Sequence, residues 1–226
     1  MKYLYETHMH TAEVSACAVS RAADQVRAYK RRGYAGVIVT DHFINGNSVI
    51  PINLRWDRRM DLFVAGYEKA KKEGVKRGVD VFFGWEYTLD GSDFLTYGLG
   101  PEFLYEHPDF DRLTIEQYSA LIRSSGGYIA QAHPFRVAAY IKNQFPAAPE
   151  LLDGVEVHNA SMPADVNEKA LAFAKLHGLP MQSGSDSHNV ELRFPASGVA
   201  LDQKAADIFD IIGAIKSGAA ELLIPL

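Results

Sequence analysis

Near its start the chain reads Tyr3-Leu4-Tyr5-Glu6-Thr7-His8-Met9-His10. The first five residues have the character of a short buried β-strand, and two histidines follow with one residue between them. Because side chains alternate between the two faces of an extended strand, His8 and His10 point to the same side. The stretch therefore predicts a strand that delivers two imidazoles to one place.

Polar residues of the same kind follow five later strand-like runs. These endings are Thr40-Asp41-His42, Gly84-Trp85-Glu86, Ala132-His133-Pro134, Glu156-Val157-His158-Asn159 and Ser185-Asp186-Ser187-His188. In parallel α/β folds the carboxyl ends of the strands share one face, where loops distant in sequence converge. A single His-x-His pair is readily explained by chance, but six such endings together are not. They predict one shared site.

Strand-like runs alternate with helix-like segments along the whole chain. The predicted strands are Tyr3–Thr7, Gly36–Thr40, Val79–Trp85, Phe94–Leu99, Tyr128–Gln131, Gly154–Val157 and Pro180–Gly184. The predicted helices are Ser20–Arg32, Arg58–Arg77, Thr114–Ser125, Pro163–His177 and Ala206–Ser217. This alternation favours a mainly parallel sheet, open or closed into a barrel. No linker or repeat interrupts it, so we expect residues 1–226 to form one domain.

Local signals mark the ends of several helices. Thr114 and Gln117 fit a capping box, in which each side chain satisfies a free backbone N–H of the other residue. Gly33, Gly126 and Gly178 each follow a helical stretch, where a left-handed residue often ends the helix.

Composition excludes several classes of protein. The 226 residues are 47% hydrophobic, and 23 basic against 28 acidic residues give a net charge of −5. That charge supplies no basic field to hold nucleic acid. The single cysteine, Cys17, excludes a disulfide framework and a multi-cysteine zinc site, and we expect it to be buried or incidental. With no apolar run near the roughly 18 residues of a membrane span, and no signal peptide, we expect a cytoplasmic protein without a membrane partner.

The residue types at the strand ends indicate the ligand chemistry. Imidazole and carboxylate without thiolate suit Zn²⁺, Mn²⁺ or Fe²⁺. His107 and His177 do not follow strand-like runs, and we interpret both as structural.

The ordered motifs resemble those of the PHP superfamily (polymerase and histidinol phosphatase domains). They are His8-x-His10, Thr40-Asp41-His42, Glu86, His133-Pro134 and Ser185-Asp186-Ser187-His188. The resemblance covers essentially the whole chain. It implies an α/β fold, a distorted (β/α)7 barrel of TIM-barrel-like form, with a metal cluster at the C-terminal face of the strands. It also implies phosphoester hydrolysis with two or three divalent metal ions.

The resemblance also implies a ligand set. The residues concerned are His8, His10, His42, Glu86, His133, Asp186 and His188. The first metal would be held by His8, His10, Glu86 and Asp186. Glu86 would bridge to a second metal held by His133, and His42 and His188 would belong to a third position.

Three further positions remain open as ligands. Many relatives supply another ligand shortly after the His-x-His pair, where Glu13 is a better donor than the neighbouring Ser15. Asp93 stands near the position of another family ligand. His158 would be either a ligand or a substrate contact.

The expected reaction is attack by metal-activated hydroxide on phosphorus. Arg136 and Arg193 follow metal motifs closely enough to bind phosphoryl oxygens, although a solvated surface position explains either arginine equally well.

The acidic charge and small size favour a small phosphorylated substrate and hence a small-molecule phosphatase. The alternatives are a nuclease-like phosphodiesterase, a non-catalytic metal-binding domain and a hydrolase of C–N bonds. A basic groove leading to the metals would indicate the nuclease.

Overall fold

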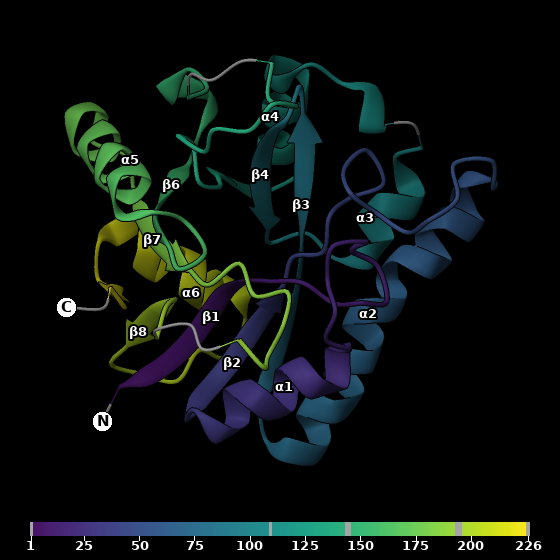
Figure 1. Cartoon of the computed structure of the whole chain (residues 1–226), viewed down its shortest axis with the longest axis horizontal. Coiled ribbons are helices and arrows are strands. Elements are labelled where there is room, and N and C mark those ends of the chain that lie inside the picture. Colours follow the sequence, from purple (N-terminus) through teal and green to yellow (C-terminus); the bar gives the residue numbers. More distant parts are fainter. Residues whose placement is uncertain (1, 109, 143–145, 193–195, 225–226) are drawn as a thin grey trace.

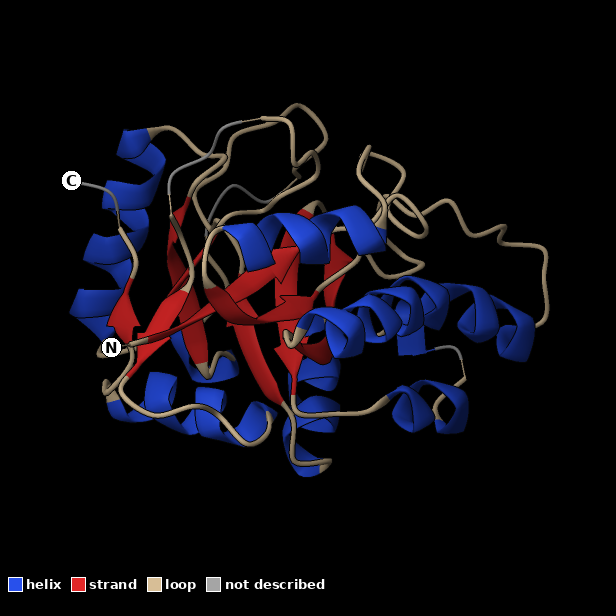
Figure 2. Cartoon of the chain, turned by 90° about the horizontal axis from the view of Figure 1, so that it is seen from below, coloured by secondary structure: helices blue, strands red, loops and turns tan. Residues whose placement is uncertain are grey.

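A curved nine-stranded sheet occupies the centre of the molecule, and helices lie around its outside (Figures 1 and 2). The computed structural model describes residues 2–108, 110–142, 146–192 and 196–224. The strands are β1 (Tyr3–Met9), β2 (Tyr34–Val39), β3 (Asp80–Leu89), β4 (Ser92–Tyr97), β5 (Tyr128–Gln131), β6 (Gly154–Asn159), β7 (Met181–Gly184), β8 (Val199–Leu201) and β9 (Glu221–Leu222). The α-helices are α1 (Ala22–Arg31), α2 (Trp56–Arg77), α3 (Pro101–Glu106), α4 (Ile115–Ser124), α5 (Ala164–His177) and α6 (Ile208–Ser217).

All seven predicted strands are present, but one of them runs in the opposite direction to that expected. β1, β2 and β3 pair in parallel, as do β5, β6 and β7. β4 is antiparallel to both β3 and β5, so it is the second arm of a hairpin and not a further β/α unit. Asp90 and Gly91, with φ of 50° and 86°, turn the chain between β3 and β4. Positive φ at both central residues is typical of a tight two-residue hairpin.

The sheet is nearly closed into a barrel. Its strand order is β7-β6-β5-β4-β3-β2-β1-β8-β9, and β8 and β9 are short antiparallel strands that the sequence did not predict. The β7 edge nevertheless reaches β1: the Thr7 hydroxyl donates to the Ser183 carbonyl at 2.6 Å, and Met9 forms a parallel bridge with Ser187. The barrel-like α/β fold is confirmed, and six of its strands run in parallel.

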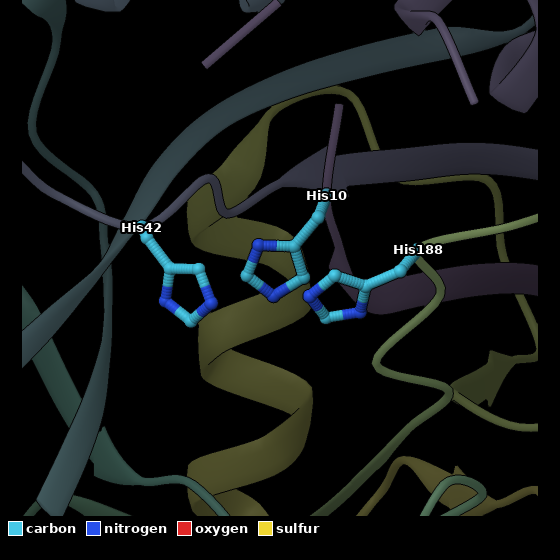
Figure 3. Close-up of side chains that lie close together, drawn as sticks. All are labelled: His10, His42 and His188. Carbon is cyan, nitrogen blue, oxygen red and sulfur yellow. The ribbon is translucent and has the colours of Figure 1, made fainter. Parts of the chain in front are cut away.

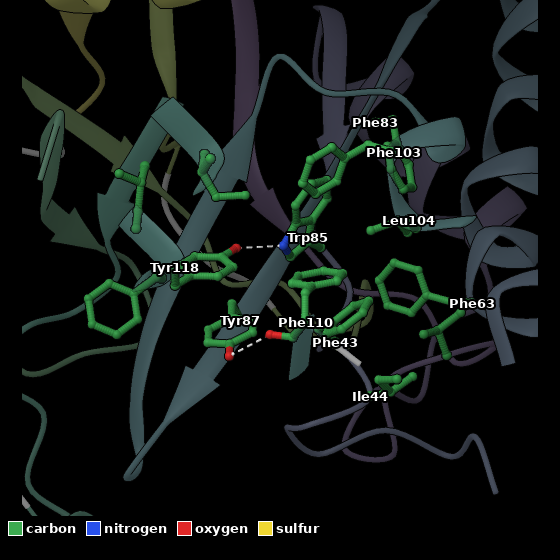
Figure 4. Packing of buried hydrophobic residues seen from close by; sticks show 14 of the residues in the cluster. Phe43, Ile44, Phe63, Phe83, Trp85, Tyr87, Phe103, Leu104, Phe110 and Tyr118 are labelled. Carbon is green, nitrogen blue, oxygen red and sulfur yellow. Dashed lines mark hydrogen bonds between the residues drawn. The ribbon is translucent and has the colours of Figure 1, made fainter. Parts of the chain in front are cut away.

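Aromatic side chains fill the space between the β3–β4 hairpin and the helices beside it (Figure 4). Phe83, Trp85 and Tyr87 of β3 all point into this cluster, as alternation along a strand requires. Phe43 and Phe110 pack against them, with ring centroids 4.6 Å apart. The residues between these aromatic positions, Glu86 among them, therefore face the other side of the sheet.

The helices are amphipathic. α2 buries Met60, Phe63 and Ala70 along one side and exposes charged residues along the other. Thr114 and Gln117 form the predicted capping box at the start of α4. No helix within the described ranges is long and apolar enough to cross a membrane.

Candidate metal centre

The seven residues implied as ligands meet at the carboxyl ends of the parallel strands. His8 and His10 come from the end of β1, and Glu86 from β3. The others lie two to four residues after the ends of β2, β5 and β7: His42, His133, Asp186 and His188. Four groups of donor atoms lie within 4.8 Å of one another: His8–His10–Glu86, His8–His133–Asp186, His42–Glu86–Asp93 and His10–His42–His188. Asp93, left open by the sequence, belongs to the cluster.

Donor atoms of His8, His10, Glu86 and Asp186 have the spacing of ligands around one ion. His8 Nε2 lies 3.1 Å from His10 Nε2, 3.3 Å from Glu86 Oε1 and 3.4 Å from Asp186 Oδ1. His10 Nε2 lies 3.4 Å from Glu86 Oε2 and 3.2 Å from Asp186 Oδ1. Ligand bonds of about 2.1 Å place neighbouring donors about 3.0 to 3.4 Å apart in octahedral or tetrahedral sites. The four side chains fit a divalent ion.

Glu86 gives a second, independent indication of a cation site. Its side chain is fully buried, and neither carboxylate oxygen has a hydrogen-bond partner. His42 Nδ1 lies 2.7 Å from Glu86 Oε2, yet it too lacks hydrogen-bond geometry. His133 Nε2 lies 3.4 Å from Glu86 Oε1 and 3.9 Å from Asp93 Oδ2. Burying polar atoms without hydrogen-bond partners costs free energy, so these oxygen and nitrogen atoms need a partner other than one another. A bound cation would supply it.

His10, His42 and His188 form a third group at the open side of the cluster (Figure 3). The His10 ring stacks on His188 with centroids 4.1 Å apart, and the centroid of His42 is 4.4 Å from that of His10. His188 is partly exposed, whereas His10 is completely buried. The three rings lie side by side between the interior and the solvent.

Hydrogen bonds from surrounding residues orient the two histidines of β1. His8 Nδ1 lies 2.9 Å from Glu156 Oε1, and His10 Nδ1 lies 3.0 Å from the Ser15 hydroxyl. Ser15 donates its own proton to Asp41 at 2.7 Å, so its oxygen accepts from His10. Both rings thereby keep the Nε2 lone pair for the cluster. Glu156 had no predicted role, and its contact with His8 joins residues that are 148 positions apart.

Space for this arrangement depends on a glycine at the end of β7. A Cβ atom at Gly184 would lie 2.5 Å from Glu156 Oε1 and 2.6 Å from the Cβ of His8. Any larger residue would push apart the pair that orients His8. Glu156 Oε2 also accepts from the backbone N–H of His133 at 3.0 Å and from Asn159 Nδ2 at 2.9 Å.

Two site residues have a strained backbone. His133 and Asp186 adopt positive φ values of 27° and 55°, a region that residues other than glycine rarely occupy. The third such residue in the described ranges, Asp90, belongs to the β3–β4 hairpin. Strain of this kind persists where the surrounding structure enforces it, and it concentrates at functional sites.

The electrostatics of the cluster separate its carboxylates from one another. Burial raises the pKa of Glu86, but the His42 and His8 charges lower it well below its ordinary value. The pKa of Asp186 is likewise low, because His8 and His10 outweigh its burial. Burial, followed by the Glu86 charge, raises the pKa of Asp93 to about 6. The neighbouring imidazoles thus favour the ionised form of Glu86 and Asp186, whereas burial and the Glu86 charge favour the neutral form of Asp93.

Glu13 is the predicted ligand that the structure does not bring to the cluster. Its Oε2 accepts from the backbone N–H of Ala22 at 2.9 Å, and its Oε1 lies 3.7 Å from Lys69 Nζ. Glu13 therefore caps the start of α1. Ser15, which the sequence analysis ranked below Glu13 as a metal donor, is the residue whose hydroxyl contacts His10.

His158 is also displaced from its expected role. A bulge between Glu156 and His158 interrupts the pairing of β6 with β7, and it brings Asn159 into register with Gly184. Glu156 and Asn159 consequently face the cluster, while His158 Nδ1 lies 3.3 Å from the amide of Asn167 in α5. Arg193 lies outside the described residues.

A cavity of about 750 Å³ opens onto the cluster. His42, His133, Asp186 and His188 line one part of it. Arg136 lies on the wall, with its guanidinium carbon 5.6 Å from the centroid of the Tyr140 ring. Cys17 is not buried, which was one of the two expectations for it: it is exposed and lines this cavity.

Comparisons with known proteins found similar structures but no family or curated protein with a similar sequence. No family profile matches the chain, and no curated protein does. A two-domain protein from Bacteroides vulgatus, containing a predicted PHP-like metal-dependent phosphoesterase, matches 98% of the chain with a TM-score of 0.69 and 16% identity. The chain spans 64% of that protein's length.

Two other solved structures are similar over nearly the whole chain. PsfC from Pseudomonas syringae has a TM-score of 0.61 at 17% identity, covering 91% of this chain and 84% of PsfC. An amidohydrolase from Chromobacterium violaceum, with bound sulfate and no metal, has a TM-score of 0.55 at 14% identity, covering 93% and 96%. The chain therefore has the PHP-like fold that its sequence motifs predicted.

Proposed function

We propose that the chain is a PHP-type metal-dependent phosphoesterase that hydrolyses small organic phosphates. The observation that carries the proposal is the environment of Glu86. Its buried oxygens lack hydrogen bonds, yet imidazole nitrogens of His42, His8, His10 and His133 surround them at 2.7, 3.3, 3.4 and 3.4 Å. A structural metal site has no need of an open cavity beside it, whereas a catalytic site does.

Divalent ions held by these donors would lower the pKa of a bound water to about 7 and polarise the phosphoryl oxygens. The protein's own part is to fix the donors. Glu156 and Ser15 hold His8 and His10 with their Nε2 atoms toward the cluster. Glu86 lies between the His8–His10 pair on one side and His133 on the other, so one carboxylate serves both groups.

Arg136 is the proposed anchor for the phosphoryl group. It lines the same cavity as His133 and Asp186, and its planar fork matches the geometry of phosphate oxygens. Tyr140 supports the guanidinium from one side.

The cavity favours compact substrates over polynucleotides. Its volume of about 750 Å³ lies within the range of small-molecule sites. Among its described lining residues, Arg136 is the one arginine or lysine. A nuclease needs a basic groove that follows the backbone of its substrate, so we propose that phosphomonoesters are preferred over diesters.

The test is hydrolysis of p-nitrophenyl phosphate and bis-p-nitrophenyl phosphate by protein that has been chelated and reloaded with Mn²⁺, Zn²⁺ or Fe²⁺. We expect turnover that depends on metal and a higher kcat/KM for the monoester. A diester preference would instead support the phosphodiesterase. Loaded protein that hydrolyses an amide but neither ester would overturn the proposal in favour of C–N bond hydrolysis.

A further inference from the structure

The cavity has two unlike parts. One part is lined by the donor groups of the metal centre. The other, which we call the outer wall, is lined by residues outside those groups, among them Asn45, Thr88, Arg136, Tyr140, Ser161 and Met162. Of the described residues on the outer wall, Arg136 has the one charged side chain. Once Arg136 holds the phosphoryl group, a charged leaving group would lose hydration on this wall without gaining an ion pair.

Most polar side chains of the outer wall already form hydrogen bonds within the protein. Asn45 Nδ2 donates to the Thr88 carbonyl at 2.7 Å, and Thr88 Oγ1 donates to Asp93 Oδ1 at 2.6 Å. Ser161 Oγ donates to the Ser185 carbonyl at 2.9 Å. The hydroxyl groups of a sugar would therefore meet side chains whose protons are largely engaged elsewhere.

Tyr140 presents a ring to the cavity from a backbone position that is fixed. The residue is 57% exposed and lines the cavity. Its segment is bonded to the β3–β4 hairpin, because the Lys142 N–H donates to the Asp90 carbonyl at 3.0 Å. A Cβ atom at Gly91 would lie 2.9 Å from the Tyr140 carbonyl oxygen. The hairpin thus packs directly against the backbone of Tyr140, which a side chain at position 91 would prevent.

The same ring adjoins the proposed phosphate anchor. The Arg136 guanidinium carbon lies 5.6 Å from the centroid of the Tyr140 ring. A phosphoryl group held by Arg136 therefore places the group esterified to it next to Tyr140. Met162 lines the same cavity, and its thioether makes favourable contacts with aromatic rings.

We propose that the substrate is the phosphate ester of an alcohol with an uncharged aromatic ring, and that Tyr140 is the residue that selects it. Hydrolysis breaks the phosphorus–oxygen bond of the ester, and water supplies the hydroxyl on phosphorus and the proton on the released alcohol. The inference rests on the proposed function, since it names the substrate class of the same site.

Two phosphonates that differ by a phenyl group provide the test. Phosphonates contain no ester bond, so the binding of 2-phenylethylphosphonate and ethylphosphonate to metal-loaded protein can be measured by calorimetry without any turnover. We expect the phenyl compound to bind at least about tenfold more tightly. We also expect a higher kcat/KM for 2-phenylethyl phosphate than for glycerol 1-phosphate, whose leaving alcohol is similarly acidic.

Variants assign the preference to the ring. The ratio of the two phosphonate affinities should fall to near unity in Tyr140→Ala and be retained in Tyr140→Phe. Met162→Ala should lower it by less. The matched control is Tyr105→Ala, which removes a partly exposed tyrosine of α3 and should leave the ratio unchanged. Using a ratio cancels any effect of these changes on phosphate binding by Arg136.

Equal binding of the two phosphonates by the wild type would overturn the proposal, and the proposed function would stand if phosphomonoesters are hydrolysed. A ratio that falls in Asn47→Ala but not in Tyr140→Ala would also overturn it, in favour of recognition by hydrogen bonds. A preference for the phenyl compound in protein that hydrolyses no phosphoester would support the aromatic subsite and contradict the proposed reaction. Loaded protein that binds neither phosphonate would contradict both.

Discussion

Trp85 and Glu86 are neighbours on β3, both fully buried, and they belong to two different kinds of interior. On the Trp85 side the polar groups of the buried rings are paired: Trp85 Nε1 donates to the Tyr118 hydroxyl at 2.7 Å, that hydroxyl lies 2.6 Å from Thr96 Oγ1, and the Tyr87 hydroxyl donates to the Phe110 carbonyl at 3.1 Å. On the Glu86 side, both carboxylate oxygens lack hydrogen-bond partners.

The contrast separates residues that stabilise the fold from residues that hold a ligand. Dispersion and hydrophobic burial account for the aromatic side, where the Tyr87 and Tyr118 rings stack with centroids 3.8 Å apart. The other side concentrates buried charge, which costs free energy unless it is compensated. A single strand supplies both, because alternate side chains face opposite ways.

The largest effect should follow from Glu86→Gln. This change keeps the shape of the side chain and removes the charge that serves both donor groups. We expect kcat/KM of the metal-loaded protein for p-nitrophenyl phosphate to fall at least about a thousandfold, or about 4 kcal/mol. The matched control is Glu13→Gln, which makes the same chemical change outside the cluster and should retain wild-type turnover. Equal activity in the two variants would contradict the site.

Trp85→Ala should have the opposite profile. It removes the largest side chain of the aromatic cluster and leaves the donors of the centre in place. We expect the free energy of unfolding in urea to fall by about 3 to 5 kcal/mol. Trp85→Phe, which keeps an aromatic ring, should lose less. An unchanged unfolding midpoint for Trp85→Ala would show that this side of β3 does not carry the stability assigned to it.

Stability should respond to pH in opposite ways with and without metal. Burial by itself lowers the pKa of His8 and of His42. Neighbouring carboxylates, Glu156 beside His8 and Glu86 beside His42, more than offset this effect, so both pKa values lie above the ordinary 6.5 in the metal-free protein. The stabilisation from these protonated rings is complete below pH 6.5 and is lost as pH rises through the folded-state pKa.

Metal binding needs the same nitrogens deprotonated, so it strengthens as pH rises. Above pH 6.5 we therefore expect the Tm of the metal-free protein to fall and the stabilisation added by metal to grow. Calorimetry of both forms across this range provides the measurement. Parallel pH curves for the two forms would argue against metal binding at these imidazoles.

The smallest effect concerns the exposed cap at the start of α4, the helix that carries Tyr118. Thr114→Ala removes the side chain that accepts from the Gln117 N–H at the start of α4. We expect a loss of about 1 kcal/mol in unfolding free energy and unchanged turnover, with Thr114→Ser retaining most of the stability. A change in turnover would mean that α4 is coupled to the centre.

Much of the fold and of the cluster could be predicted because the signals are local. Each predicted strand is a short apolar run. His8 and His10 stand at the end of β1 and Glu86 stands within β3, so alternation along the strand fixes the direction of all three side chains. The reversal of β4 had a local signal as well, the Asp90-Gly91 dipeptide, which favours a two-residue hairpin. β8 and β9 have three and two residues, too few for a periodic pattern.

The remaining differences arise from contacts between distant residues. A bulge in β6 decides that Asn159 and not His158 faces the cluster, and no pattern in that strand marks the extra residue. Glu13 is chemically the better ligand, but its cap on α1 takes it elsewhere. Cys17 reaches the cavity because its neighbours bond to Asn47 and His188, and the sequence contains no trace of that pairing.

The most direct test of the central claim is anomalous diffraction from crystals of the reloaded protein, recorded on either side of the absorption edge of the metal supplied. We expect a peak bounded by Glu86, Asp186 and the Nε2 atoms of His8 and His10. Peaks confined to other parts of the molecule, or none in protein that elemental analysis shows to contain metal, would contradict it.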